Sequence, residues 1–215
     1  MANTDIPALF AESLTNLKLT DKQKAVLEAS LKLFSEKGFD NTSTSDIAKL
    51  AGVSEGTVYK QFKTKAGILK AIVEPFAENV IPLAATEFLD EVSTENLPDF
   101  KDFLTTVIKN RFQFAMNNLP QLRILFHEAI TTPKISEKIS KEILTLLSSN
   151  LKQAYLFYQT KGELVKWSPD RIFRYMISTV VGYVIPVLLI PGLTLDVDQV
   201  TKESTEFLLK GLSPK

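Results

Sequence analysis

Apolar residues recur at helical spacing along nearly the whole chain, and this pattern predicts a fold made of helices. No run of strict apolar and polar alternation exceeds four residues, so strands are not expected. Prolines divide the chain beyond its first third into segments of ordinary helix length. Helices are expected there over residues 97–118, 120–131, 134–161, 169–190 and 197–211.

The start of the chain carries fewer signals of regular structure. Residues 1–20 include Pro7 and are expected to form a loose N-terminal arm with one short helix at most. Asp21 is the expected N-cap of the first secure helix, and Gly38 ends that helix because glycine readily adopts the C-cap conformation. A fourth helix is expected to open near Lys65.

Two short helices separated by a three-residue turn lie between the first and the fourth helix. The run from Ser43 to Asp46 is a variant capping box, and Gly52 stops the first short helix after about two turns. Val53 fills the gap at the turn, and Ser54 caps the next helix. This arrangement is typical of a helix-turn-helix, whose second helix enters the major groove of DNA. The polar face of that helix consists of Glu55, Gly56, Thr57, Tyr59, Lys60 and Gln61.

Composition narrows the partners and excludes most enzyme chemistry. The 215 residues carry 25 basic and 25 acidic side chains, so affinity for nucleic acid must come from a local patch. Residues 41–70 supply one, with five lysines against two carboxylates. Without cysteine, with His127 as the single histidine and without a glycine-rich phosphate loop, no nucleophile, metal site or nucleotide site can be assembled. We therefore expect neither an enzyme nor a cofactor or metal, and the lack of a secretory signal favours the cytoplasm.

The helix-turn-helix residues carry a family resemblance. Residues 42–65 read TSTSDIAKLAGVSEGTVYKQFKTK, and residues 33–39 read LFSEKGF. Together they resemble the DNA-binding signature of the TetR/AcrR family of transcriptional repressors. The resemblance implies a three-helix DNA-binding head over residues 21–66, a larger ligand-binding and dimerisation domain over residues 67–215, and a homodimer built from the last two helices.

The resemblance also implies a function. It is that of a repressor that binds double-stranded, pseudo-palindromic operator DNA and is released by a small lipophilic effector. Lys65 would contact phosphate, and Ser45 stands where the family often has a long basic residue. Glu55 places a negative charge on the reading helix, either to accept a hydrogen bond from cytosine N4 or to lower non-specific affinity. The expected DNA contacts are Ser43, Thr44, Ser45, Glu55, Gly56, Thr57, Tyr59, Lys60, Gln61 and Lys65.

Aromatic residues are dense beyond residue 80, where they build a core and can line a cavity between the middle helices. An apolar lining suits a lipophilic or aromatic effector, although core packing also explains each single aromatic. His127 either lines the pocket or is structural, and Arg111 pairs either with Glu128 or with an anionic ligand. The candidate ligand residues are Phe103, Arg111, Phe112, Phe126, His127 and Tyr155.

The stretch from Tyr175 to Leu195 contains no charged residue and admits two explanations. It is long enough to cross a bilayer, which would make the chain a membrane-associated or interaction protein, although Pro186 interrupts it. Alternatively, it forms a buried helix at a subunit interface, as in the family's dimers. We favour the interface and expect no stable membrane insertion. The expected interface residues are Met176, Val180, Gly182, Tyr183, Val184 and Phe207.

Overall fold

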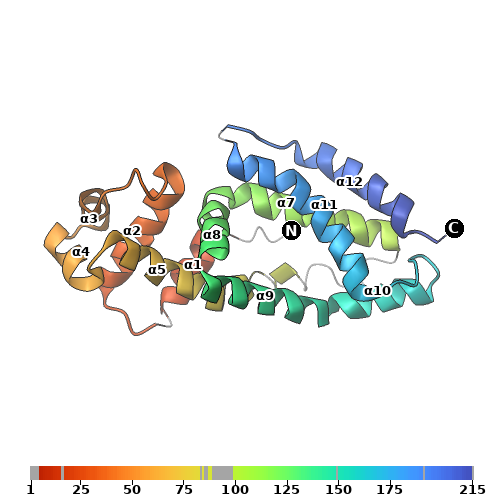
Figure 1. The fold of residues 1–215 in the computed structure, drawn as a ribbon, viewed down its shortest axis with the longest axis horizontal. Helices are drawn as coiled ribbons and strands as arrows, with labels where there is room; N and C mark the ends of the chain where they lie inside the picture. The colour runs from red at the N-terminus through yellow and green to blue at the C-terminus, as the bar shows by residue number, and fades with distance from the viewer. Residues whose placement is uncertain are drawn as a thin grey trace. The chain divides into compact units, whose positions relative to one another are not determined.

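A computed structural model describes residues 5–15, 17–82, 84, 87, 88, 99–148, 150–190 and 192–214, without the side chains of residues 142–150. All regular elements within these residues are helices, which confirms the expected all-helical fold (Figure 1). Contacts divide the chain into two compact units. The N-terminal unit comprises residues 5–84 with 120–140, and the C-terminal unit comprises residues 85–119 with 141–215.

The N-terminal unit contains the two short helices of the expected helix-turn-helix and the helices that support them. Within it, α2 packs against α3 and α5, and α3 packs against α4. This unit extends past residue 66, so the functional boundaries proposed at residues 20 and 66 stay predictions. Its elements are α1 (Ile6–Thr15), α2 (Asp21–Lys37), α3 (Thr44–Ala51), α4 (Glu55–Phe62), α5 (Lys65–Pro75), the π-helix η1 (Phe76–Val80), α8 (Leu119–Thr131) and the first half of α9 (Pro133–Ser148).

The N-cap of helix α2 lies one residue earlier than the sequence analysis expected. Thr20, not Asp21, is the N-cap: its hydroxyl accepts the Gln23 amide at 3.3 Å, and the Gln23 side chain accepts the Thr20 amide at 2.9 Å. The reciprocal pair forms a capping box, which leaves Asp21 in the first turn, where its charge favours the helix dipole. The helix ends at Gly38, as predicted, with φ 82°.

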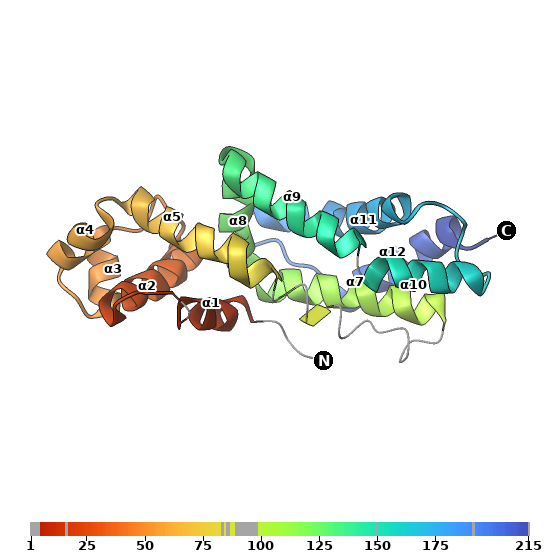
Figure 2. The same cartoon turned by 90° about the horizontal axis from the view of Figure 1, so that it is seen from below.

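Residues 6–15 are the one short helix that the sequence analysis allowed within the N-terminal arm. They form α1, in which Ile6, Phe10 and Leu14 are almost completely buried. This helix packs against η1 and α5 (Figure 2). The Phe10 ring lies 5.9 Å from the Phe76 ring. Apolar residues spaced by four were the helical signal, and Pro7 is compatible with it because proline is tolerated in a first turn.

The segment that follows α4 changes its helical form at Pro75. Proline offers no amide hydrogen to the preceding turn, and a π-helical segment follows, in which the Ile81 amide donates to the Phe76 carbonyl. Val73 and Ile135 belong to the apolar cluster that packs this segment against α9.

The C-terminal unit is built around an aromatic core. The ring of Phe103 lies 5.1 Å from that of Tyr158 and 6.3 Å from that of Tyr155, the latter edge-on at 90°. Burial raises the pKa of Tyr158 to about 12 and also raises the pKa of Tyr155, so both phenols stay neutral at working pH. Helices α7, α11 and α12 pack against one another (Figure 1). The helices of this unit are α7 (Phe100–Asn117), the second half of α9, α10 (Asn150–Thr160), α11 (Pro169–Leu189) and α12 (Val197–Leu212).

Candidate nucleic-acid interface

The N-terminus of α3 is held by the predicted capping box. The Ser43 hydroxyl accepts the Asp46 amide at 3.0 Å, and the Asp46 carboxylate accepts the Ser43 hydroxyl at 2.8 Å and the Ser43 amide at 3.1 Å. These hydrogen bonds lower the pKa of Asp46, so the carboxylate stays charged at neutral pH. The hydroxyl of Ser43 therefore caps α3, and a DNA contact by Ser43 would have to use the same hydroxyl.

The turn between α3 and α4 also has the predicted form. Gly52 is left-handed, with φ 68° and ψ 30°, and the Val53 amide donates to the Ala48 carbonyl at 3.0 Å. Ser54 caps α4 by accepting the Thr57 amide at 3.2 Å. These contacts fix the angle between the two short helices without help from any ligand.

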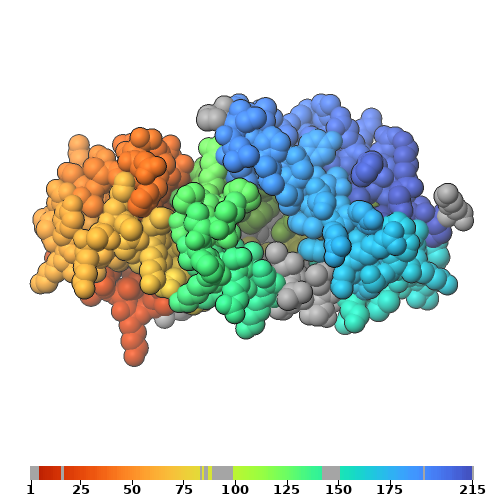
Figure 3. Space-filling model, in the orientation of Figure 1, coloured from red at the N-terminus to blue at the C-terminus, as the bar shows by residue number. Residues whose placement is uncertain are grey.

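The outer face of α4 is open to solvent (Figure 3). Tyr59 is 51% exposed although it is a large aromatic residue. A Cβ atom built on Gly56 would meet only the Ser54 hydroxyl, at 4.0 Å, so this glycine leaves room for a close approach. Such a face can approach base edges in a major groove. Glu55, Gly56, Tyr59 and Lys60 are exposed, and Thr57 and Gln61 are partly buried.

Side chains at the N-terminal ends of α3 and α4 contact each other. The Thr44 hydroxyl donates to Glu55 Oε1 at 2.6 Å and lies 3.3 Å from the Tyr59 hydroxyl. The carboxylate of Glu55 therefore bridges the two helices, a role that neither explanation from the sequence included. Ser45 is exposed beside them.

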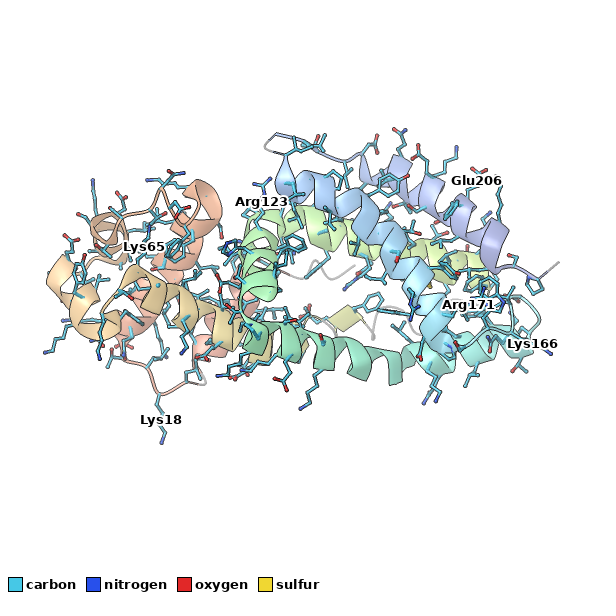
Figure 4. All side chains as sticks on the ribbon, viewed as in Figure 1. Lys18, Lys65, Arg123, Lys166, Arg171 and Glu206 are labelled. Atoms are coloured by element: carbon cyan, nitrogen blue, oxygen red, sulfur yellow. The ribbon has the colours of Figure 1, made fainter. Side chains whose placement is uncertain are left out.

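The ammonium group of Lys65 has partners that the sequence analysis did not foresee. It donates to the carbonyls of Phe39 at 2.7 Å and Thr42 at 3.0 Å, with Asp40 at 3.4 Å, and it lies 4.3 Å from the centre of the Phe39 ring (Figure 4). An ammonium group has three N–H donors, and three carbonyls surround this one. Lys65 therefore holds the segment between α2 and α3 in this structure, and the expected phosphate contact stays a prediction.

The joint between α4 and α5 is unusually tight. Lys63 has φ 63° and ψ −43°, and across it the Thr64 amide donates to the Phe62 carbonyl at 2.7 Å. This is a γ-turn of the rare form with positive φ, which costs a non-glycine residue on the order of 1–3 kcal/mol. Gly67 passes so close that a Cβ atom on it would lie 2.3 Å from the Phe62 carbonyl oxygen.

Four of the six candidate ligand residues belong to the C-terminal unit. Phe103, Phe112 and Tyr155 are at most 1% exposed and belong to the packed core of the C-terminal unit. Arg111 lies in the same unit, with its guanidinium 3.9 Å from the centre of the Phe88 ring. Their burial supports the core explanation that the sequence analysis left open.

The other two ligand candidates lie on α8 in the N-terminal unit. The side chain of His127 is 72% exposed and contacts Glu128 at 3.2 Å. Phe126 is partly buried. Glu128 also accepts the Thr132 hydroxyl at 3.0 Å.

The dimer residues expected on α11 divide between two faces. Met176 and Val180 are 4% and 7% exposed and face the core, where the Tyr155 hydroxyl lies 3.4 Å from the Met176 sulfur, so little of either side chain is open to a second copy. Tyr183 and Val184 are partly buried against the same core, whereas Gly182 is exposed.

A groove of about 430 Å³ runs between α11 and α12 on the outer face of the unit. Phe207 is 70% exposed at this groove. The Tyr183 hydroxyl donates to Glu203 at 3.0 Å, and this contact raises the pKa of Tyr183. Five of the lining residues, three on α11 and two on α12, were not among the residues that the sequence analysis named. The lining consists of Tyr175, Ser178, Thr179, Gly182, Tyr183, Glu203, Ser204 and Phe207.

Helix α11 is long and apolar enough to cross a membrane by length and composition, and 28% of its most apolar window is buried. Its outward face, however, carries the hydroxyls of Ser178 and Thr179 along the groove. A face of this kind suits a protein contact better than lipid.

Comparison with known proteins matches this geometry. Residues 26–72 match the family model described as bacterial regulatory proteins, tetR family. The chain is 37% identical over 164 residues to the uncharacterized HTH-type transcriptional regulator YvdT of Bacillus subtilis, which covers 74% of this chain and 80% of that protein. It is 23% identical over 199 residues to the fatty acid metabolism regulator protein of the same organism, covering 90% of this chain and 97% of that protein. A solved structure of a transcriptional regulator from Saccharomonospora viridis in complex with choline matches with a TM-score of 0.69 at 18% identity, over 90% of this chain and 98% of that one. The chain belongs to the TetR family of transcriptional regulators.

Proposed function

We propose that this protein is a ligand-responsive repressor that binds a pseudo-palindromic operator as a homodimer and is released by a small lipophilic effector. The observation that carries the proposal is the open polar face of α4 on a fully capped helix-turn-helix. Because the chain has no net charge, binding rests on local contacts from two heads, and a monomer binds poorly. Such a protein acts in the cytoplasm, where its DNA target lies.

The homodimer is proposed from the groove between α11 and α12. An exposed phenylalanine beside a groove that an exposed glycine lines is suited to a second copy, because Phe207 of each copy can enter the groove of the other around a two-fold axis. The buried hydroxyl of Ser204 has no hydrogen-bond partner among the described residues. A four-helix interface of this kind would cover the apolar side chains that made α11 resemble a membrane span.

The effector is proposed to be lipophilic because the C-terminal unit is dominated by buried apolar and aromatic side chains. The name of the fatty acid metabolism regulator protein, to which the chain is similar over most of its length, agrees with this class. The effector releases the repressor only if it binds one separation of the two heads more tightly than the other.

Operator binding is tested with the DNA immediately upstream of the protein's own gene. Fluorescence anisotropy at several salt concentrations should show specific binding by the wild-type dimer. Lys60→Ala on α4 should weaken binding, whereas Lys101→Ala, an equally exposed lysine on α7, should not. Wild-type protein that shows no salt-sensitive preference for this DNA over a scrambled duplex would contradict the proposal.

Effector release is tested separately by a thermal-shift screen of fatty acids, acyl thioesters and choline against the purified protein. A ligand of the proposed class raises the unfolding temperature and lowers operator affinity. A hydrophilic cation that does both would overturn the lipophilic class and leave the repressor proposal intact.

A further inference from the structure

Lys63 is the one non-glycine residue with positive φ among the residues that the structure describes. Glycine adopts this conformation at little cost, and it does so at Gly38 and Gly52, the two neighbouring turns of the same head. The joint after α4 instead keeps a lysine, exposed to solvent. Strained residues cluster at functional sites, so the side chain at this position calls for a functional explanation.

We propose that Lys63 contacts the DNA backbone and belongs to the operator interface, a contact that the sequence analysis did not include. The proposal rests on the proposed function, since it requires α4 to lie in the major groove. A helix in that position has phosphates beside it, and lysines that flank it fix its register on the duplex.

The charges around α4 support this assignment. Lys65 is turned toward three backbone carbonyls, so it adds little to the surface that DNA would meet. The two carboxylates of the same stretch are also engaged, Asp46 by Ser43 and Glu55 by Thr44. Positive charge on and directly after α4 therefore resides on two exposed lysines, Lys60 and Lys63.

The joint also fixes the backbone of Lys63 relative to α4. Its amide donates to the Tyr59 carbonyl at 2.9 Å, and the following residue, Thr64, caps α5 by accepting the Gly67 amide at 2.9 Å. A side chain that starts from such a constrained backbone loses less freedom on binding than one on a flexible loop. The fixed backbone therefore directs the Lys63 side chain toward one phosphate position each time α4 binds.

The test separates the charge of Lys63 from its backbone strain with three variants. Lys63→Arg keeps the charge, Lys63→Ala removes the charge and keeps the strain, and Lys63→Gly removes both. Lys166 is the matched control, because the Trp167 amide donates across it to the Val165 carbonyl at 2.8 Å in a similar short turn without positive φ. Operator affinity is measured by fluorescence anisotropy against salt concentration, and stability by urea unfolding.

Two phosphate contacts per dimer predict that Lys63→Ala and Lys63→Gly both reduce the slope of log affinity against log salt by about 1.8. Between 50 and 200 mM salt, the wild type should then lose about twelvefold more affinity than either variant. Lys63→Arg should keep the wild-type slope, and Lys63→Gly should unfold at a higher urea concentration than Lys63→Ala. Lys166→Gly should change neither the slope nor the affinity and should be less stable than Lys166→Ala.

Operator binding by the wild type with an unchanged slope in Lys63→Gly would overturn this inference and leave the repressor proposal standing. If Lys63→Gly is less stable than Lys63→Ala and the slope is unchanged, the lysine serves the C-terminus of α4 and not DNA. Absence of specific binding by the wild type would overturn the proposed function and this inference with it.

Discussion

Lys65 shows how one side chain can support the DNA-binding head through contacts within the protein. Its ammonium group is the donor for carbonyls in the segment between α2 and α3, directly before the cap of α3. Hydrogen bonds from charged donors contribute about 1.5–3 kcal/mol, and carbonyls that lose this donor must find water instead. The orientation of α3 therefore depends on a residue from α5.

Lys65→Met is expected to lower the free energy of unfolding by about 1.5–3 kcal/mol, because the carbonyls lose a charged donor while the apolar stem stays. Urea unfolding measures this. Operator affinity should fall with the salt slope unchanged, since no phosphate contact is removed. A slope reduced by about 1.8 per dimer would instead restore the phosphate contact that the family resemblance implied.

Gly67 is required by contact and not by its backbone angles. Gly67→Ala would place a methyl group 2.3 Å from the Phe62 carbonyl oxygen, a backbone atom that cannot rotate away. We expect a loss of about 1–3 kcal/mol in unfolding free energy, as for other overpacked sites. Gly56→Ala is the matched control within α4, where the nearest atom lies at 4.0 Å, and it should gain about 1 kcal/mol from helix propensity. Equal effects in urea unfolding at the two glycines would contradict this account.

Residue roles were predictable from the sequence only where local backbone chemistry decides them. The capping box at Ser43 and the left-handed Gly52 follow from neighbours within four residues, and both are confirmed. The partners of Lys65 lie more than 20 residues away along the chain, so no local pattern reveals them. The same holds for the contact between Thr44 and Glu55, which depends on how two helices cross.

At the scale of elements, the positions of most helices could be predicted because prolines, glycines and caps mark their ends. The core-facing side of α11 could not be predicted, because the helix is apolar on both faces and periodicity alone does not say which face meets the core. Burial of Met176 and Val180 resolves the choice and turns Ser178 and Gly182 outward. A π-helix such as η1 has no sequence signal beyond Pro75.

Two ion pairs join α5 and η1 to α9. Glu74 lies 2.8 Å from Lys134, and Glu78 pairs with Lys138 one turn further on. The double variant Lys134→Glu with Lys138→Glu should lower the thermal midpoint, because four carboxylates then face one another. Adding Glu74→Lys and Glu78→Lys should restore most of the loss, and the difference should shrink at high salt. If the fourfold variant does not restore the thermal midpoint, the two lysines stabilise the protein through their apolar stems alone.

The ion pair between Glu74 and Lys134 predicts how stability depends on pH. The hydrogen bond from Lys134 lowers the pKa of Glu74, so the stabilisation is complete above the ordinary glutamate value of about 4.3 and is lost as the pH falls through the lowered value. The pKa of Lys134 is raised by the same hydrogen bond, so its share is complete below about 10.4 and is lost as the pH rises through the raised value. Thermal midpoints of wild type and Lys134→Met, compared between these limits, should differ by a constant amount and converge on the acid side. A difference that persists below the lowered value would exclude the ion pair as its cause.

At the scale of the whole molecule, the proposed homodimer depends on the surface that α11 and α12 share. Two copies of Phe207 buried across a two-fold axis contribute at least about 3 kcal/mol together, so Phe207→Lys should weaken dimerisation by more than about a hundredfold. Light scattering after size exclusion should give a mass near the 24.0 kDa of one chain for this variant and twice that for the wild type. Phe157→Lys on α10 is the matched control, because Phe157 is 41% exposed but lies outside the groove.

The monomeric variant should also lose operator binding, since a neutral chain with one head retains only half of the local contacts. A Phe207→Lys protein that stays dimeric would place the interface elsewhere, and one that is monomeric yet binds the operator as tightly as wild type would refute the need for two heads.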